Sequence, residues 1–237
     1  WDISMYNKND KSTCGAHPNS RFTAKATNCP CLSSEFNNPK GVPISAIVFG
    51  GRRAKTAPLV YQSTSWQNGT FVGSIMASET TAAASGAVGV VRRDPMAMRP
   101  FTGYDMGDYF GHWLEMGKNI PNPPKIFHVN WFRTDADGHF IWPGFGDNMR
   151  VLLWILARCE GKVDARETAI GYVPYAKDIN IEGLDITEDT VNELLSVDNE
   201  AWLADVENIK EFYDMIGGTV PCELREELSA LKARLSK

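Results

Sequence analysis

The fold is decided by residues 125–161, which read KIFHVNWFRTDADGHFIWPGFGDNMRVLLWILARCEG. The first part, residues 125–132, is rich in β-branched and aromatic side chains and predicts a strand. A helix is predicted from Asp147 or Asn148, because either side chain can cap it and apolar residues then recur at helical spacing. A strand that leads through a loop into a helix indicates a mixed α/β fold.

The loop of this unit, residues 131–148, combines five aromatic side chains with glycines, a proline and a terminal Asp147-Asn148 pair. Aromatic faces with polar groups at their edge suit a slot for a planar ring, so we expect a purine-base pocket here. The alternative is a hydrophobic β-hairpin closed by a turn at Pro143-Gly144. Residue types alone leave both interpretations open.

Upstream, residues 42–49 predict a strand that runs into Gly50-Gly51-Arg52-Arg53. Glycines at the carboxyl end of a strand let backbone N–H groups approach an anion, and the two arginines add positive charge. This sequence therefore predicts an anion site. Residues 59–61 predict a second short strand, and residues 66–78 predict a helix.

Residues 79–89 carry small side chains with little to bury, which is typical of an alanine-rich helix end or of a mobile loop. Residues 105–119 predict an amphipathic helix, because apolar side chains recur at steps of three and four. Its apolar face comprises Met106, Tyr109, Phe110, Trp113 and Met116.

Beyond Gly171 the chain is predicted to be helical and acidic, with Thr187 capping one helix and a last helix over residues 221–235. An apolar stripe on the helix between them comprises Trp202, Val206, Ile209, Tyr213 and Ile216. We expect these helices to be scaffold with solvated charged faces, and we assign them no chemistry.

Composition narrows the class of protein. The 237 residues carry a net charge of −5, without the basic stripe that a nucleic-acid surface needs, and with no apolar run long enough to span a membrane. The odd number of cysteines, 5, indicates free thiols. We expect a cytoplasmic protein, with the mitochondrial matrix as the alternative, and no partner that is a nucleic acid or a membrane.

Asn19, Ser20 and Arg21 bring an amide, a hydroxyl and a guanidinium together in an irregular segment. Such groups suit the recognition of a carboxylate or a phosphate, although a polar turn with Arg21 in solvent would use the same residues. No pair of histidines has metal-ligand spacing, so we assign no metal ligands to this chain. We expect His128, on an apolar segment, to be a satisfied core residue.

Taken together, these motifs resemble GTP-dependent phosphoenolpyruvate carboxykinase in order and spacing, from about residue 15 onward. The motifs that carry the resemblance are residues 17–22, 49–53, 78–84, 94–101, 127–132 and 142–148. The chain resembles only the carboxyl-terminal part of that enzyme. The resemblance implies that the family's kinase-type phosphate loop, its Mn²⁺ or Mg²⁺ ligands, its reactive cysteine and a substrate arginine lie upstream.

The resemblance also implies roles for individual residues. Asn19, Ser20 and Arg21 would hold oxaloacetate or phosphoenolpyruvate, and Arg52 would contact the phosphates of GTP or GDP, which makes Arg21 and Arg52 the catalytic candidates. The nucleotide site would further comprise Phe101, Trp131, Phe132, Phe140, Phe145, Gly146, Asp147 and Asn148. A lid that closes over the ligands would comprise Ser78, Glu79, Thr80, Thr81, Ala82, Ala83, Ala84, Ser85 and Gly86.

The fold class expected from this resemblance is the nucleotide-binding carboxyl-terminal portion of the family's α/β fold, a mixed sheet with flanking helices. We expect a single portion over residues 1–237, with a loop-rich strap at 1–40, a mixed α/β region at 41–160 and a mainly helical end at 161–237. The implied enzyme, a monomer when complete, converts oxaloacetate and GTP to phosphoenolpyruvate, GDP and CO₂. The alternatives are an inert guanine-nucleotide-binding fragment and a structural module that binds nothing.

Overall fold

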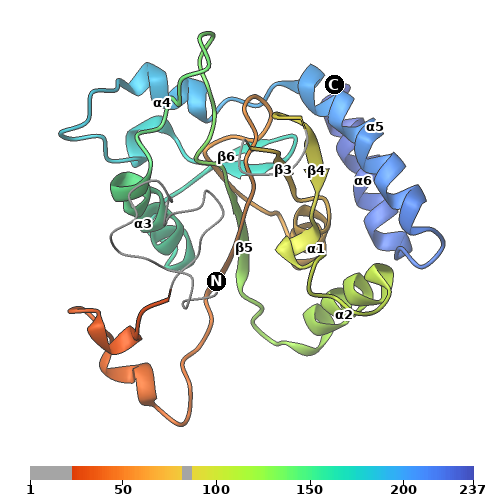
Figure 1. The fold of residues 1–237 in the computed structure, drawn as a ribbon, viewed down its shortest axis with the longest axis horizontal. Coiled ribbons are helices and arrows are strands. Elements are labelled where there is room, and N and C mark those ends of the chain that lie inside the picture. Colours follow the sequence, from red (N-terminus) through yellow and green to blue (C-terminus); the bar gives the residue numbers. More distant parts are fainter. Residues whose placement is uncertain (1–22, 82–86) are drawn as a thin grey trace, which may run out of the picture. The chain divides into compact units, whose positions relative to one another are not determined.

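A computed structural model describes residues 23–81 and 87–237 (Figure 1). The chain divides into two compact units, one of Trp1–Pro43 with Thr80–Gly89 and one of Ile44–Glu79 with Val90–Lys237. In the first unit the structure describes two 3-10 turns, Ala26–Asn28 and Ser34–Asn37. The predictions made for residues 19–21 and 82–86 lie outside the described residues. All strands and α-helices of the described chain lie in the second unit.

A mixed five-stranded sheet forms the centre of the second unit, in the order β1-β5-β2-β7-β6. Only β1 and β5 are parallel; every other neighbouring pair is antiparallel. The strands are β1 (Ala46–Gly50), β2 (Val60–Gln62), β5 (Lys125–Val129), β6 (Arg166–Thr168) and β7 (Gly171–Val173). The predicted mixed α/β class is confirmed.

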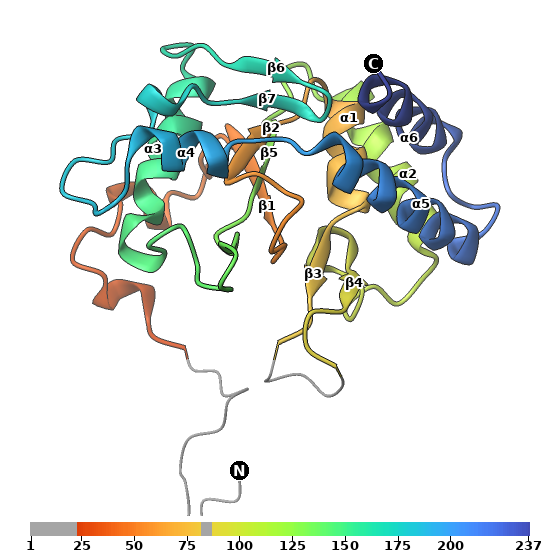
Figure 2. The ribbon, with the colours of Figure 1, turned by 90° about the horizontal axis from the view of Figure 1, so that it is seen from above.

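Helices cover both faces of the sheet, with α3 and α4 on one side of β5 and α1, α2, α5 and α6 on the other (Figures 1 and 2). The sequence of β5 explains why. Successive side chains of a strand point to opposite faces, and Ile126 belongs to the core on the α1 side whereas Phe127 and Val129 belong to the core on the α3 side. The strand is therefore buried from both sides.

Six α-helices are described: α1 (Trp66–Ser74), α2 (Met106–Asn119), α3 (Asn148–Cys159), α4 (Glu188–Leu194), α5 (Asn199–Ile216) and α6 (Cys222–Leu235). The predicted helices at 105–119 and 221–235 are confirmed. Thr187 caps α4 by accepting a hydrogen bond from the backbone of Thr190, as predicted. The stripe of α5 is also confirmed, since Trp202, Ile209 and Tyr213 are buried.

The predicted helix over residues 66–78 is wrong at its end, because α1 stops at Ser74 and β3 (Ala77–Glu79) follows. That strand exists through pairing with β4 (Val91–Arg93), which local propensity does not reveal. The predicted strand over residues 42–49 begins later, at Ala46, where its register partner Lys125 begins β5.

The predicted capping of α3 is also wrong. The Asp147 carboxylate accepts from Nε of Arg150 at 2.9 Å, and Oδ1 of Asn148 accepts from Nε1 of Trp142 at 2.9 Å. Neither side chain caps the helix, because both are engaged elsewhere. Helix α3 instead continues from a 3-10 turn at Phe145–Asp147.

Free thiols are confirmed for the cysteines in the described part of the chain, which are Cys29, Cys31, Cys159 and Cys222. Across residues 23–81 and 87–237, no helix has both the length and the apolar character to cross a membrane.

Candidate functional site

Parallel pairing of β1 and β5 brings the segments that follow them together at the carboxyl ends of the two strands. Strands β1 and β5 end side by side, with Gly50 opposite Val129. The loop after β1, residues 51–54, therefore emerges next to the segment after β5, residues 130–132. We call residues 51–54 the arginine loop. Its first residue must be glycine, because a Cβ on Gly51 would collide with a backbone oxygen of β3.

Asn130 joins these two segments. Its side chain is buried, with 1% exposed, and its Oδ1 accepts from the backbone N–H groups of Arg53 and Phe132, each at 3.2 Å. Its Nδ2 donates to the carbonyl oxygens of Arg53 and Ala57, each at 2.7 Å. A side-chain amide offers two acceptor lone pairs and two donors. All of them are used, so Asn130 fixes the arginine loop to the start of residues 131–148, which we call the aromatic segment.

Arg52 lies between β3 and the aromatic segment. Its N–H donates to Oγ of Ser78 at 3.0 Å, and its carbonyl oxygen accepts from the N–H of Glu79 at 2.8 Å. Its guanidinium carbon lies 3.9 Å from the ring centre of Phe132 and 5.5 Å from that of Phe140. A guanidinium over an aromatic face is a cation–π contact. The side chain has no carboxylate partner in the described structure.

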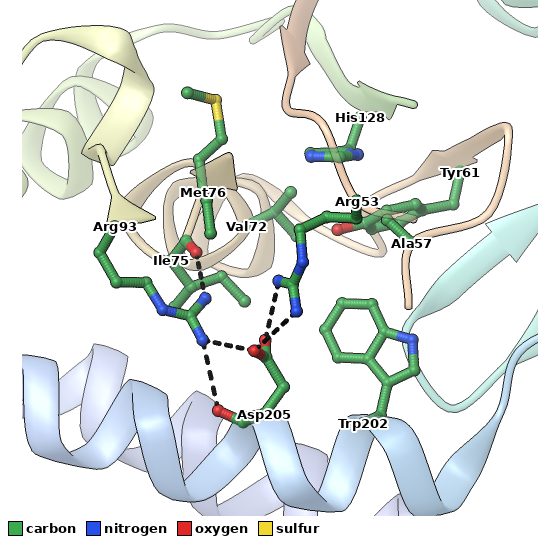
Figure 3. A pocket seen from close by; sticks show the side chains of 11 residues that line it. Arg53, Ala57, Tyr61, Val72, Ile75, Met76, Arg93, His128, Trp202 and Asp205 are labelled. Carbon is green, nitrogen blue, oxygen red and sulfur yellow. Dashed lines mark hydrogen bonds and ion pairs between the residues drawn. The ribbon is translucent and has the colours of Figure 1, made fainter. Parts of the chain in front are cut away.

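Arg53, the next residue, has the opposite environment. It is buried, and its guanidinium donates to Oδ1 of Asp205 at 3.0 Å (Figure 3). The guanidinium also donates to Oγ1 of Thr56 at 3.1 Å. The prediction that both arginines contribute to an anion site is therefore wrong for Arg53. Arg53 already has a carboxylate partner from the chain itself, and only Arg52 remains available to a ligand.

Arg93, on β4, shares that carboxylate. Its guanidinium donates to Oδ1 of Asp205 at 2.6 Å, to the carbonyl oxygen of Ile75 at 2.7 Å and to Oδ1 of Asn208 at 2.9 Å. Burial alone would raise the pKa of Asp205, but the charges of Arg93 and Arg53 and their hydrogen bonds outweigh it and hold that pKa below its ordinary value. Asp205 is therefore ionised and neutralises part of the charge of two buried guanidinium groups.

The aromatic segment begins with a hairpin. Thr134 pairs with Phe140, and the turn between them closes through Asp135 and Gly138. A hairpin was the alternative to a base pocket, but it closes here and not at Pro143-Gly144. The rings of Phe132 and Phe140 meet edge to face, with centres 5.7 Å apart and planes at 69°. This geometry leaves the Phe132 face in contact with Arg52.

The other predicted nucleotide-site residues vary in exposure. Phe145 and Phe101 are 99% and 77% exposed, and neither makes a ring contact with another residue of the described chain. Gly146 is exposed as well, whereas Trp131 packs partly against the core on the α3 side. Trp142, also in the segment, is 1% exposed and faces the core, not a pocket.

The roles of Asn130 and Asp205 were not predicted from the sequence. The prediction that the helices beyond Gly171 contribute only solvated charges is wrong for Asp205, which is 7% exposed. A signal was available, since Asp205 falls next to Val206 within the apolar stripe of α5, where a solvated carboxylate does not belong. Asn130 offered no such signal, because a polar residue at the end of a strand is common.

His128 occupies β5 beside the buried group of Arg53, Arg93 and Asp205, which we call the arginine network. It is buried, its ring stacks on Tyr61 with centres 5.2 Å apart, and its Nδ1 has no hydrogen-bond partner in the described structure. It is a core residue as predicted, although not a fully satisfied one. Burial, assisted by the charge of Arg53, lowers the pKa of His128 to about 4, so the ring is neutral at pH 7.

One group of side chains among the described residues could hold a cation: Asp135, Asp137 and His139 in the exposed hairpin turn. Oδ1 of Asp135 already accepts from the N–H groups of Asp137 and His139, each at 2.9 Å. These hydrogen bonds show that Asp135 orders the turn.

The fold and the site define an α/β chain in which an arginine loop and an aromatic segment meet at the carboxyl ends of two parallel strands. The chain belongs to the family described as Phosphoenolpyruvate carboxykinase C-terminal P-loop domain, whose model matches residues 1–234. The P-loop of that description has no counterpart here, because the sequence contains no glycine-rich loop that ends in Gly-Lys followed by Ser or Thr.

Curated relatives support this membership. The chain is 55% identical over 228 residues to phosphoenolpyruvate carboxykinase (GTP) of Renibacterium salmoninarum, covering 95% of this chain and 38% of that protein. It is 53% identical over 220 residues to the enzyme of that name from Anaeromyxobacter dehalogenans, and 52% identical over 234 residues to that from Treponema pallidum. These matches cover 93% and 96% of this chain. The chain spans 37% to 38% of the length of these relatives.

Proposed function

We propose that this chain supplies the guanine-nucleotide site of a GTP-dependent phosphoenolpyruvate carboxykinase. The observation that carries the proposal is the contact of Arg52 with Phe132 and Phe140. A nucleotide has a planar base and a charged phosphate chain, and here an unpaired guanidinium lies against aromatic rings at the edge of the sheet. The relatives' printed name, phosphoenolpyruvate carboxykinase (GTP), supports the choice of guanine nucleotide.

Arg52 has two functions in this proposal. Its guanidinium carbon lies 3.9 Å from the ring centre of Phe132, over the face that a base would cover. On binding, the base takes that face and Arg52 turns to the phosphates, where a charge-assisted hydrogen bond is stronger than a cation–π contact with a neutral ring. Trp131, Phe140, Phe145, Gly146, Asp147 and Asn148 would complete the base site, and Phe101 would lie near the nucleotide.

The whole enzyme would convert oxaloacetate and GTP to phosphoenolpyruvate, GDP and CO₂. Loss of CO₂ from oxaloacetate leaves an enolate, whose oxygen attacks the γ-phosphorus while the bond to the β-phosphate oxygen breaks. Arg52 would neutralise charge on the phosphates in this step. On the family resemblance alone, Asn19, Ser20 and Arg21 would hold the dicarboxylate substrate and Ser78 to Gly86 would act as a lid that excludes water.

A guanine-nucleotide-binding chain without catalysis is the second candidate, and the missing P-loop sequence favours it for the chain by itself. An assay of GTP-dependent decarboxylation of oxaloacetate separates the two. Turnover by the chain alone excludes the second candidate, whereas GDP binding without turnover supports it.

The test of the proposed site is a calorimetric titration of the chain with GDP, ADP and guanosine, repeated for the variant Arg52→Ala. We expect GDP to bind more tightly than ADP. In the variant, loss of the phosphate contact should weaken GDP binding by about tenfold or more. Guanosine has no phosphate, so its affinity should not fall, and release of the cation–π contact should raise it by about two- to fivefold.

Lys162→Ala is the matched control. Lys162 is an exposed cation that pairs with Glu160 at 2.6 Å, so its removal changes the net charge equally without touching the site. If both variants lost the same GDP affinity, the effect of Arg52→Ala would be explained by the change in net charge and not by loss of a contact at the site. Failure of the chain to bind GDP, or equal affinity for ADP, would refute the proposed site.

A further inference from the structure

Three charged side chains meet behind the arginine loop, each from a different part of the chain. Arg53 comes from the arginine loop, Arg93 from β4 and Asp205 from α5 (Figure 3). Their exposed fractions are 8%, 6% and 7%. Burying two guanidinium groups beside one carboxylate is costly unless each charge is paired and hydrogen-bonded. The burial of these three charges is therefore better explained by a specific function than by stability alone.

This cluster is not itself a ligand site. The cavity that it lines has a volume of about 20 Å³, room for one water molecule but not for a phosphate group. The terminal nitrogens of both guanidinium groups already donate to Asp205, Thr56 and the carbonyl oxygen of Ile75. What the cluster can do is hold the segments that carry the two arginines.

Those segments are the ones next to the proposed nucleotide site. Arg53 follows Arg52 directly, so fixing its side chain fixes the peptide from which Arg52 extends. Nε of Arg53 also lies 3.9 Å from Oε1 of Glu79, and that oxygen accepts from the N–H of Ala54 at 3.0 Å. Arg93 fixes β4, the partner strand of β3. One carboxylate thus holds both the arginine loop and the hairpin against which the loop is hydrogen-bonded.

We propose that Asp205 is a positioning residue for nucleotide binding: by pairing with Arg53 and Arg93 it holds the arginine loop so that Arg52 faces the nucleotide. The inference rests on the proposed function, since Arg52 is the group that would touch the ligand. Asp205 acts from the far side of the loop and touches no ligand.

The test is a double-mutant cycle on GDP affinity with Asp205→Asn and Arg52→Ala. If Asp205 acts through Arg52, each single variant weakens GDP binding by about tenfold, and the double variant binds no more than about twofold worse than Arg52→Ala alone. Effects that multiply in the double variant, to about a hundredfold, would overturn the inference, as would wild-type affinity in Asp205→Asn.

Asp214→Asn is the matched control, because Asp214 lies on the same helix but is exposed and pairs with Lys210 and Arg225 at the surface. It should leave GDP affinity unchanged. Hydrogen exchange gives a readout that needs no nucleotide. In Asp205→Asn the amides of Arg52, Arg53 and Ala54 should exchange at least about tenfold faster, while amides of β5 keep their protection. Unchanged exchange in the arginine loop would also overturn the inference.

If Asp205→Asn does not fold, Thr56→Val tests the same inference. This nearly isosteric change removes the hydroxyl that accepts from Arg53 at 3.1 Å but leaves both charges paired. GDP binding should weaken by about two- to threefold, and this loss should vanish in the Arg52→Ala background. A Thr56→Val chain that binds GDP like wild type would overturn the inference. If the wild-type chain binds no GDP, the proposed function is refuted instead. The hydrogen-exchange experiment still tests whether Asp205 holds the arginine loop, because it needs no nucleotide.

Discussion

The arginine network and the aromatic segment lie on the two sides of the arginine loop and differ in how their side chains are held. Arg53, Arg93 and Asp205 are each less than 10% exposed and hydrogen-bonded to one another. Phe140 and Phe145, by contrast, are 55% and 99% exposed. Buried polar groups must be paired where they stand, because water cannot replace a missing partner. Exposed rings carry no such requirement.

This difference suits the two sides of the arginine loop to different functions: the arginine network can hold the loop in place, and the aromatic segment can contact a ligand. On the network side of the loop the terminal guanidinium nitrogens of Arg53 and Arg93 already donate to other parts of the chain, so this side can hold a position but has no room or free terminal nitrogen for a phosphate. On the aromatic side, ring faces are exposed and the Arg52 guanidinium has no carboxylate partner in the described structure, so this side can bind a ligand but is less fixed. Of the two adjacent arginines, Arg53 belongs to the network side and Arg52 to the aromatic side.

The largest effect is expected at the joint between the two regions. Asn130→Ala removes four hydrogen bonds and leaves buried N–H and C=O groups of Arg53, Phe132 and Ala57 without partners. We expect the free energy of unfolding to fall by about 3 kcal/mol, measured by urea denaturation. Asn122→Ala, at an exposed position, is the control and should change it by less than about 0.5 kcal/mol. A loss below about 1 kcal/mol for Asn130→Ala would contradict its joining role.

An intermediate effect is expected from pH on the network side. The unfolded chain protonates His128 below pH 6.5, whereas the folded chain does so only near 4. Acid therefore favours the unfolded state in this window, and His128 should cost about 2 kcal/mol of stability between pH 7 and pH 5. His128→Phe keeps a ring on Tyr61 and should remove this part of the pH dependence. The exposed His139→Gln should retain it; equal slopes in wild type and His128→Phe would disprove the assignment.

The smallest effect on stability is expected on the aromatic side. Phe145→Ser should change the free energy of unfolding by less than about 0.5 kcal/mol, because the ring is 99% exposed. If Phe145 contacts the base, GDP should nevertheless bind about five- to a hundredfold more weakly, as expected for the loss of one aromatic stacking partner. Calorimetry and urea denaturation on one preparation test both statements. A destabilised variant, or one with unchanged GDP affinity, would break the contrast between the two regions.

Much of the fold could be predicted from the sequence, because helices and strands leave periodic patterns within a few residues. The run of β-branched and aromatic residues in β5 and the three- and four-residue steps in α2 and α5 are local signals of this kind. The end of α1 could not be predicted, because Ala77–Glu79 becomes a strand only by pairing with Val91–Arg93, across a separating segment. Pairing between distant segments leaves no local signal.

The candidate site was predictable in part. Its residue types and their order indicated an anion site and an aromatic slot, and they carried the resemblance to the family that the comparisons confirm. The proposed roles of Arg21, Arg52 and the aromatic residues remain predictions. Residue types could not show that Trp142 turns into the core, since its exposure depends on the packing of α3 behind it.

The sequence by itself determined the family, the mixed α/β class and the segments in which a nucleotide site would lie, because motif order and periodicity are written along the chain. Only the tertiary structure decided which of two adjacent arginines is paired with a buried carboxylate. Arg53 is paired because Asp205, 152 residues further on, enters the core beside it, and Arg52 is not. A buried charge takes the partner that folding brings to it, and that choice depends on contacts between distant segments.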